Sequence, residues 1–301
     1  MSSIIHITNL NELSVSNNQL VILDEKKCKK NISLKDILAI IIENCRCRIS
    51  GLLQLRLSEN NIPLIICNEK HQPVLHSLGL YNHFQITMRI NEQVNWIDIK
   101  KDEIWSKIVI QKIKNQRNLL KFLEKSENTV SKLEMYEKNI SEEKKDTEYQ
   151  EAIAARVYFQ ELFGKKFKRF NNDGINSALN YGYALLRSLI SSKIVAKGFH
   201  PSLGIHHKSQ FNNYNFADDI IEIFRPMVDY IVYFNQKEKV ELSKELRQSL
   251  LLILIQKVYW KNKKYELSQV IDYFLDNIRN YFINENIEIE IPELRIDDYE
   301  Y

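Results

Sequence analysis

The stretch from 176 to 226 contains a dense set of side chains that can bind a metal ion. Gly198, Pro201 and Gly204 mark a turn within it, between two apolar segments of helical period. Hard and borderline divalent metals prefer oxygen and imidazole ligands that converge from separate elements. The turn offers imidazoles and the helix that follows offers carboxylates, so the stretch is a candidate metal site. Its possible ligands are His200, His206, His207, Asp218, Asp219 and Glu222.

The carboxylates of this stretch have two interpretations. Asp219 and Glu222 are three residues apart, so on a helix they share one face and can bind one ion together. The helix dipole alone also favours acidic residues in a first turn. That alternative explains Asp218 and Asp219 well and Glu222 less well, and the pattern leaves both open. Arg225 is predicted to pair with Asp219.

Glu151 is the first residue of another apolar helical segment. Ala154, Ala155 and Tyr158 share its face, and the two alanines would let a second backbone approach closely. The carboxylate would then point inward. Periodicity alone favours the simpler alternative of an exposed glutamate, because most glutamates are solvated.

Basic residues gather where a polyanion could meet this candidate site. One group follows the Glu151 segment, one residue lies on the central helix, and a separate run lies near position 262. Clusters of this kind bind the phosphate groups of nucleic acids without recognising the base sequence. Cations are also favoured at helix C-termini, so solubilising helix ends are the alternative. The first group is Lys165, Lys166, Lys168 and Arg169, Arg187 lies on the central helix, and the last run contains Lys261, Lys263 and Lys264.

Composition narrows the class of protein. The chain has 301 residues, a formal net charge of +3 and only 7 glycines and 5 prolines, which favours long helices. No glycine-rich phosphate loop and no GxSxG elbow occur, so nucleoside triphosphate chemistry and a serine triad are not expected. No apolar run has the length of a membrane helix. The four cysteines, Cys28, Cys45, Cys47 and Cys67, predict buried reduced thiols and a reducing cytoplasm.

The predicted fold class is α+β, with a small β-rich, sandwich-like domain followed by a larger all-α catalytic domain. Short apolar runs bounded by polar turns predict strands at Ile4–Ile7, Leu13–Val15, Leu20–Leu23, Ile37–Ile42 and Leu64–Cys67, with one helix at Ser50–Asn60. The boundaries are 1–80 for the β-rich domain, 81–100 for a linker and 101–301 for the helical domain. Helical periodicity predicts helices at 102–123, 130–139, 149–163, 174–196, 217–234, 242–261 and 267–283, with a charged loop at 141–146 and an acidic tail from 287.

Four motifs in order resemble the integrase of CRISPR adaptation, the catalytic protein of spacer acquisition. The amino-acid sequence around His207 is most similar to the branch of this family found with type II systems. The resemblance also includes K-I-x-N-Q at Lys112–Gln116. The motifs are E-x-x-A-A-x-x-Y-F at Glu151–Phe159, N-S-A-L-N-Y-G-Y-A-L-L-R at Asn176–Arg187, G-F-H-P-S-L-G-I-H-H at Gly198–His207 and A-D-D-I-I-E-I-F-R-P at Ala217–Pro226.

The resemblance implies a metal site made of Glu151, His207 and Glu222, with Asp219 as a nearby catalytic helper. The family pattern G-x-x-H, counted from Gly204, selects His207 rather than His206. Mg²⁺ or Mn²⁺ is the implied ion. The family's basic DNA surface is not specific enough in sequence to assign contacts, so the lysines and arginines above remain candidates only.

The resemblance also implies an activity and its partners. Family members join the 3′-hydroxyl ends of captured DNA fragments to the CRISPR repeat by transesterification, and the same site cuts branched DNA. They act in the bacterial cytoplasm as homodimers, through the β-rich domain, with two dimers flanking a dimer of a small ferredoxin-like partner. Other type II adaptation proteins are further possible partners. The competing hypotheses are a catalytically inactive DNA-binding scaffold and a small-molecule metal hydrolase.

Overall fold

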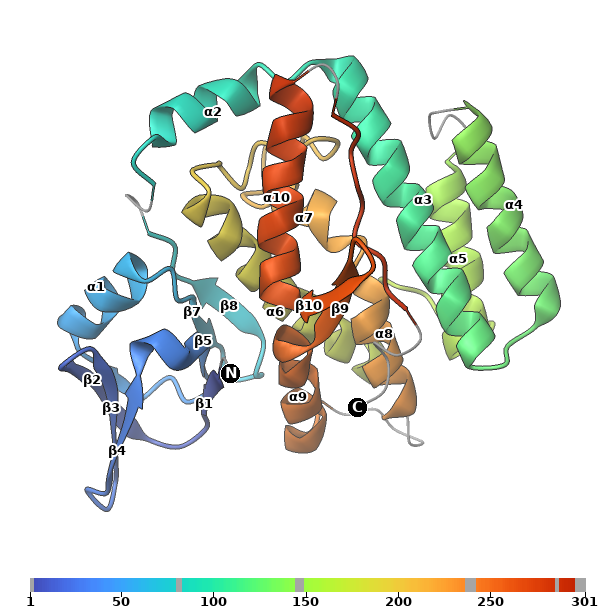
Figure 1. Cartoon of the computed structure of the whole chain (residues 1–301). Coiled ribbons are helices and arrows are strands. Elements are labelled where there is room, and N and C mark those ends of the chain that lie inside the picture. Colours follow the sequence, from blue (N-terminus) through green and yellow to red (C-terminus); the bar gives the residue numbers. More distant parts are fainter. Residues whose placement is uncertain (1–2, 80–82, 144–148, 236–241, 285–286, 296–301) are drawn as a thin grey trace. The chain divides into compact units, whose positions relative to one another are not determined.

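The computed structural model describes residues 3–79, 83–143, 149–235, 242–284 and 287–295 (Figure 1). The chain divides into two compact units, and neither is continuous in sequence. The first, the β-rich unit, consists of Met1–Ile90 and Ser188–Phe199. The second, the helical unit, consists of Asn91–Arg187 and His200–Tyr301. Strands at the N-terminal end and mostly helices thereafter give the α+β class that the sequence predicts.

Two four-stranded sheets form the β-rich unit. The first sheet has the strand order β1-β5-β7-β8, in which β1, β5 and β7 are parallel and β8 is antiparallel to β7. The second sheet has the strand order β4-β3-β2-β6. The strands are β1 (Ser3–Ile7), β2 (Asn11–Ser16), β3 (Gln19–Asp24), β4 (Lys29–Ser33), β5 (Ile37–Ile42), β6 (Arg48–Ile49), β7 (Leu64–Cys67) and β8 (Pro73–His76). A short 3-10 turn, η1, covers Leu34–Asp36.

One apolar cluster joins both sheets to helix α1 (Gly51–Glu59). Leu13 and Leu20 from one sheet, Ile40 from the other, and Leu53 and Leu57 from α1 are all almost fully buried in it. The Ser50 side chain accepts a hydrogen bond from the Leu53 amide and so caps the helix. The sandwich-like packing, the five predicted strands and the predicted helix are therefore confirmed.

Long helices dominate the helical unit, and α3, α4 and α5 pack side by side (Figure 1). Helices α2 and α6 contribute residues to both units. The helices are α2 (Ile86–Val94), α3 (Asp98–Phe122), α4 (Glu127–Glu143), α5 (Gln150–Phe163), α6 (Gly174–Ala196), α7 (Asn215–Ile221), α8 (Arg225–Phe234), α9 (Lys244–Leu251) and α10 (Leu267–Ile283). The 3-10 helix η2 (Leu252–Ile255) leads into strands β9 (Lys257–Trp260) and β10 (Lys263–Glu266).

The predicted helix at 217–234 is wrong in one respect, because it is broken into α7 and α8. A turn over residues 222–224 separates the two helices, and Pro226 lies in the first turn of α8. A continuous helix would need a hydrogen bond from residue 226 to the carbonyl of Glu222, and proline has no N–H to donate. The break places Glu222 in a turn.

The predicted helix at 242–261 is correct only in its first half. After η2 the chain becomes extended and forms the β9–β10 hairpin, whose two-residue turn holds Lys261 and Asn262 at φ values of 49° and 61°. Trp260 pairs with Lys263 across that turn. The apolar run at 250–260 suits a buried strand as well as a helix, and Asn262, which tolerates positive φ, was the overlooked turn signal.

Other expectations need smaller corrections. Helix α4 continues through Ser141 to Glu143 into the predicted charged loop, whose remainder lies outside the described residues. The segment predicted as a linker at 81–100 contains α2 and the start of α3. The four cysteines are free, as expected, yet only Cys67 is fully buried.

The segment from 287 to 295 packs on the helical unit. Glu293 forms an antiparallel bridge with Tyr259, and the Glu290 amide donates to Asn277 Oδ1 at 2.9 Å. Leu294 is fully buried. Residues 296–301 lie outside the described part of the chain. None of the helices within the described residues has the length and apolar character needed to cross a membrane.

Candidate active site

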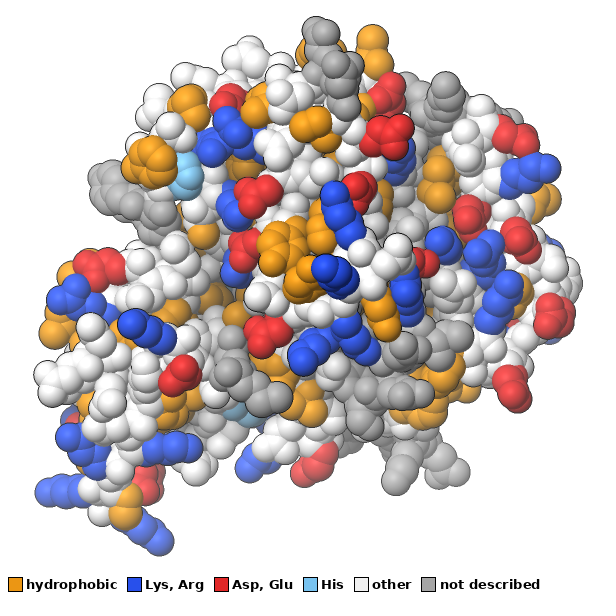
Figure 2. All heavy atoms as spheres, in the orientation of Figure 1, with side chains coloured by type: hydrophobic (Ala, Val, Ile, Leu, Met, Phe, Trp, Pro, Cys, Tyr) orange, Lys and Arg blue, Asp and Glu red, His pale blue; other side chains and the backbone are white. Residues whose placement is uncertain are grey.

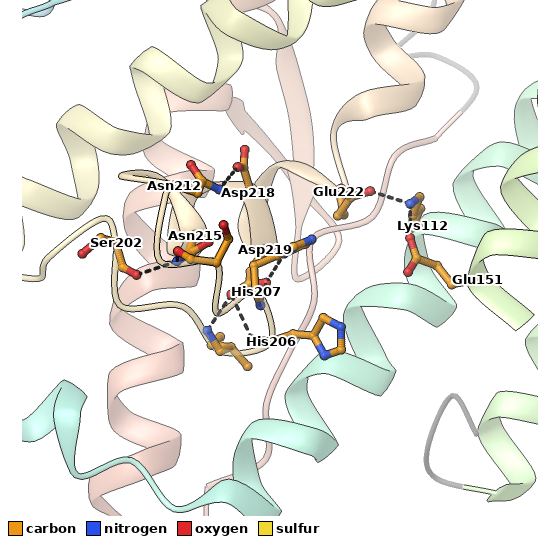
Figure 3. A network of polar contacts seen from close by, with 12 residues as sticks. Lys112, Glu151, Ser202, His206, His207, Asn212, Asn215, Asp218, Asp219 and Glu222 are labelled. Carbon is orange, nitrogen blue, oxygen red and sulfur yellow. Dashed lines mark hydrogen bonds and ion pairs between the residues drawn. The ribbon is translucent and has the colours of Figure 1, made fainter. Parts of the chain in front are cut away.

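A buried lysine occupies the centre of the candidate site. Lys112 Nζ lies 2.5 Å from Glu151 Oε1 and 2.5 Å from Glu222 Oε2 (Figure 3). The lysine comes from α3, Glu151 from the first turn of α5, and Glu222 from the turn after α7, so three separate segments of the helical unit meet here. Glu151 is therefore turned inward onto a cation and is not the fully solvated residue that periodicity favours.

Glu222 is held by a second cation. Arg225 Nε lies 2.8 Å from Glu222 Oε1, while the other carboxylate oxygen faces Lys112. Burial alone would raise the pKa of Glu222, but Arg225 and Lys112 outweigh burial and hold this pKa to about 2. The predicted pairing of Arg225 with Asp219 is wrong, because Asp219 is enclosed by other donors.

Asp219 is fully buried and accepts hydrogen bonds from a backbone cradle. The amide of Ile205 donates to Oδ2 at 2.5 Å, that of His206 to Oδ2 at 3.1 Å and that of His207 to Oδ1 at 3.1 Å. A side chain at Gly204 would collide with the backbone carbonyl of His207 and approach Asp219 Oδ2 at 2.9 Å. The turn therefore needs glycine at position 204 so that its amides can surround the carboxylate.

His207 is oriented by the same aspartate. Its Nδ1 lies 2.7 Å from Asp219 Oδ1, and this hydrogen bond raises the pKa of the imidazole despite the opposing effect of burial. With Nδ1 as the donor, Nε2 of the neutral ring keeps its lone pair for a ligand, as is usual for a metal-binding histidine backed by a carboxylate. The electrostatic influence of Glu222 reaches this ring as well.

The neighbouring histidine is placed differently. The ring of His206 stacks on Trp105 of α3, with ring centroids 4.1 Å apart and planes within 1° of parallel. Burial lowers the pKa of His206, and the charge of His207 adds to this effect. His206 thus packs as a flat, neutral ring, whereas His207 carries the hydrogen bond to Asp219.

Two further predicted ligands lie apart from this cluster. Asp218 Oδ1 pairs with Arg187 Nε at 2.7 Å, and its Oδ2 accepts a hydrogen bond from Asn212 at 2.8 Å. His200 is exposed and contacts the hydroxyl of Ser202 through Nδ1 at 2.8 Å. Neither side chain joins the Glu151–Lys112–Glu222 group.

A hollow of about 450 Å³ opens beside Glu222 and Lys112. Arg169 lines it and donates to Asn176 Oδ1 at 2.9 Å and to Asn180 Oδ1 at 2.8 Å. Phe170, on the same loop, is 99% exposed. The hollow is thus walled by cations and amides, with an unpacked aromatic ring beside it, and its lining residues are Lys112, Gln116, Ala155, Phe159, Arg169, Phe170, Asn171, Asn180, Glu222 and Arg225.

The other basic candidates lie on the surface. Lys165, Lys166 and Lys168 are exposed in the loop that leads to Arg169. Figure 2 shows Lys and Arg side chains over the β9–β10 hairpin, with acidic side chains nearby. One of these lysines, Lys261, pairs with Glu290 at 2.8 Å. This local pairing fits the solubilising role better than it fits a phosphate-binding role.

A buried polar cluster supports the site from behind. Asp229 of α8 accepts hydrogen bonds from the hydroxyl groups of Tyr158 and Tyr183, the first at 2.9 Å. Burial raises the pKa of Asp229 to about 6, and the two hydroxyl donors offset this only in part. The guanidinium of Arg225 lies 4.6 Å from the centre of the Tyr183 ring, which links this cluster to Glu222.

Comparison with known proteins identifies the family. A family model described as "CRISPR associated protein Cas1" matches residues 5–251, well over half of the chain. The chain belongs to the Cas1 family. It is 31% identical over 300 residues to the CRISPR-associated endonuclease Cas1 of Neisseria meningitidis serogroup C (strain 8013), with 98% of this chain and 97% of that protein covered.

Solved structures share the Cas1 fold. A casposase bound to an integration product matches with a TM-score of 0.78 and 20% identity, over 99% of this chain and 95% of the other. A chain of a Cas6-RT-Cas1–Cas2 complex matches with a TM-score of 0.74 and 20% identity over 96% of this chain. This chain spans 36% of the length of that one.

The donor set of this Cas1 chain suits a divalent ion. Among the described residues, no three His, Cys, Asp or Glu side chains are grouped as a ready metal site. Two carboxylates nevertheless converge on one cation, the Lys112 ammonium, at 2.5 Å each. Carboxylate oxygens are ligands that Mg²⁺ and Mn²⁺ prefer, so Glu151 and Glu222 are residues that would hold such an ion.

Sequence reasoning missed the central lysine, although a signal for it exists. Lys112 and Gln116 fall one and two turns after Ile108, on the apolar stripe of α3, and all three are buried. Charged and amide side chains on such a stripe are rarely buried without partners. The positions of Lys112 and Gln116 in the K-I-x-N-Q run therefore indicate two buried polar side chains, in addition to the resemblance to a family motif.

Proposed function

We propose that this chain is a divalent-metal-dependent DNA integrase and endonuclease of CRISPR adaptation. The observation that carries the proposal is the convergence of Glu151 and Glu222 on one buried cation, beside a histidine oriented by Asp219. The relative from Neisseria is named an endonuclease, and the casposase structure contains an integration product, both of which agree with this chemistry.

In the proposed site, Glu151, Glu222 and His207 Nε2 hold Mg²⁺ or Mn²⁺. When bound, the ion supplies Lewis-acid polarisation of a phosphoryl oxygen and lowers the cost of deprotonating a hydroxyl group. Asp219 is a positioning residue, because it acts by fixing the ring of His207. Arg225 neutralises part of the charge of Glu222, so the site can still accept a phosphate group.

The proposed reaction conserves the number of phosphodiester bonds. The 3′-hydroxyl of a captured fragment attacks a phosphodiester of the CRISPR repeat, the new P–O bond forms, and the 3′-oxygen of the repeat strand leaves with the proton. No nucleotide cofactor is required, in agreement with the absence of a phosphate-binding glycine loop from the sequence. Most of the rate enhancement would come from alignment of the two DNA ends and from charge stabilisation.

The hollow beside Glu222 is the proposed entry for DNA. Arg169 and Arg225 would face the phosphate groups, and the exposed ring of Phe170 can stack on an unpaired base. Lys165, Lys166 and Lys168 extend the positive charge along the same loop. Arg187 is the weakest of the proposed DNA contacts, because Asp218 already pairs with it.

The proposed partners follow the family. A homodimer formed through the β-rich domain at 1–80, with catalysis in the helical domain at 101–301, would present two active sites at a fixed separation. A neighbouring structure is a Cas6-RT-Cas1–Cas2 complex, which supports a second adaptation protein as partner of this chain. A ferredoxin-like partner dimer flanked by two dimers of this chain remains part of the proposal.

The deciding experiment is strand transfer into a supercoiled plasmid that carries a CRISPR repeat, with Mn²⁺ and the partner protein. We compare wild type, His207→Ala and the matched control His206→Ala. Products should fall by at least about 100-fold in His207→Ala and persist in His206→Ala, since only His207 is held by Asp219. Equal activity of wild type and His207→Ala would refute the site. DNA binding without any wild-type product would favour a scaffold.

A further inference from the structure

Lys112 has a role that the proposed metal site does not by itself require. It is a lysine with only 6% of its surface exposed, on the apolar stripe of α3, and its ammonium touches both carboxylates that would bind the metal. Lys112 Nζ lies within ion-pair distance of two carboxylates, those of Glu151 and Glu222. Its single positive charge offsets part of the negative charge of the two carboxylates.

We propose that Lys112 is a built-in counter-ion that holds Glu151 and Glu222 together before metal binding and is displaced when a divalent ion enters. The inference rests on the proposed function, since it takes Glu151 and Glu222 as metal ligands. It adds a step to that function: metal loading exchanges one bound cation for another.

Geometry makes the two cations mutually exclusive. The ammonium lies 2.5 Å from one oxygen of each carboxylate, so these two oxygens are at most about 5 Å apart. A divalent ion held by both carboxylates would need the same oxygens that now face Nζ. The two cations would also repel each other strongly at such a distance in a buried site. The lysine therefore has to leave.

The same helix offers a hydrogen-bond acceptor for the displaced ammonium, the side-chain oxygen of Gln116. Gln116 is 1% exposed, one turn further along α3, and its Oε1 is buried with no hydrogen-bond partner among the described residues. Lys112 and Gln116 both line the hollow beside Glu222. A change of rotamer in the long lysine stem would carry Nζ towards this oxygen and towards the place proposed for the DNA phosphate. A buried amide oxygen without a partner is costly, and this movement would satisfy it.

The rest of the site is anchored, so only the lysine has to move. Asn115 Nδ2 donates to the carbonyl of Ile223 at 3.0 Å, which ties α3 to the turn that carries Glu222. Arg225 keeps the other oxygen of Glu222 at 2.8 Å. Neither contact involves Lys112, and both can persist after its side chain leaves.

The test compares wild type, Lys112→Met and the control Lys114→Met, all without DNA. Lys114 lies on the same helix but pairs with Glu293 at 3.3 Å, outside the site. Mn²⁺ binding is measured from the electron paramagnetic resonance signal of free Mn²⁺, and thermal unfolding is measured in EDTA and in Mn²⁺. Removing the competitor should tighten Mn²⁺ binding by about 10-fold in Lys112→Met, and Mn²⁺ should raise its Tm more than that of wild type. Lys114→Met should match wild type.

A measurement on wild type covers the case in which Lys112→Met does not fold. Reductive methylation followed by mass spectrometry should show Lys112 protected in EDTA and more reactive in Mn²⁺, with the labelling of Lys114 unchanged. Unchanged protection of Lys112, or Mn²⁺ binding by Lys112→Met no tighter than that of wild type, overturns the inference alone. If wild type and Lys112→Met both bind no Mn²⁺, the metal dependence of the proposed function fails instead.

Discussion

Asp219 on one side, and the pair Glu151 and Glu222 on the other, are held in place by different means. Asp219 is surrounded by backbone amides and by the ring of His207, all of them fixed by the fold of one turn. Glu151 and Glu222 are brought together by the end of one flexible lysine side chain. Backbone donors cannot leave without unfolding the turn, whereas an ammonium on a four-carbon stem can. The first arrangement suits a positioning residue and the second suits exchangeable ligands.

The largest effect should come from breaking the backbone cradle. Asp219→Ala removes the buried acceptor of three backbone amides, so we expect a loss of about 3–5 kcal/mol in the free energy of unfolding together with loss of strand transfer. Urea unfolding measures the first and the plasmid assay the second. Gly204→Ala is a companion variant, because it crowds the same cradle while keeping the carboxylate. Asp219→Ala with wild-type stability would show that the cradle is not what holds the turn.

Breaking the other arrangement should affect activity more than stability. Glu151→Gln keeps the shape of the side chain and removes its charge, so the ligand set is weakened and strand transfer should fall about 100-fold, equal to about 2.7 kcal/mol. The Glu151 side chain is 26% exposed, so we expect a loss of stability below about 1 kcal/mol. Parallel activity and urea measurements separate the two effects. A stability loss as large as that of Asp219→Ala would contradict the distinction between the two groups.

The buried carboxylate of Asp229 sharpens the comparison, because its hydrogen-bond donors are neutral hydroxyl groups. The pKa of Asp229 is raised to about 6 in the folded chain, so the folded state binds a proton that the unfolded state has released between roughly pH 4 and 6. Stability from this group is present at low pH and is lost as the pH rises through about 6. Relative to Asp229→Asn, wild type should lose roughly 2 kcal/mol between pH 4.5 and 7.5.

Urea unfolding of wild type and Asp229→Asn at both pH values checks this prediction. The difference between the two proteins removes the titration of all other groups that both share. A constant difference across this range would mean that Asp229 keeps an ordinary affinity for protons despite its burial. The opposite slope, with wild type gaining stability as the pH rises, would mean that Arg225 controls its charge more strongly than burial does.

The smallest effect concerns the ring that supports the turn. Trp105→Leu removes the stack under His206 and keeps an apolar side chain, so we expect a cost of about 0.5–1.5 kcal/mol beyond the lost apolar contact area. Strand transfer should fall only modestly, because Asp219 still fixes His207. Thermal unfolding and the plasmid assay measure both. An activity loss equal to that of His207→Ala would show that the stack, and not the carboxylate, orients the site.

Local sequence signals predict the regular parts of this molecule well and the site only in part. Strands such as Ile37–Ile42 and helices such as Gly174–Ala196 follow from apolar runs and periodicity. Strand β4 has the sequence KKNIS and lies at the exposed edge of the second sheet. It was not predicted because it has too few apolar residues to show a strand pattern. Strand β9 was predicted as the end of a helix because the apolar residues before it fit a helical period as well as a strand, and Asn262 was not taken as a turn signal.

The contacts of the site depend on tertiary structure, which no local pattern contains. The family resemblance supplied Glu151, His207 and Glu222 as candidate ligands, and the helical pattern placed Asp219 beside Glu222. The pattern could not show that Arg225 faces Glu222, three residues before it, rather than Asp219, because that choice depends on the helix break before Pro226. Lys112 is 39 residues from Glu151 in sequence, so their contact exists only in the folded chain.

The interleaving of the two units along the chain has a consequence for synthesis on the ribosome. The β-rich unit needs residues 188–199, where Ser192 donates to the carbonyl of Asn61 at 3.0 Å and Gly198 lies against His83. A nascent chain that ends at residue 90 lacks this last piece. The β-rich unit can therefore be completed only after residue 199 has emerged, when Glu151 has already been made but His207, Asp219 and Glu222 have not. A gene cut at residue 90 should yield a fragment with an incomplete core surface, and restoring it would require the peptide 188–199 in trans.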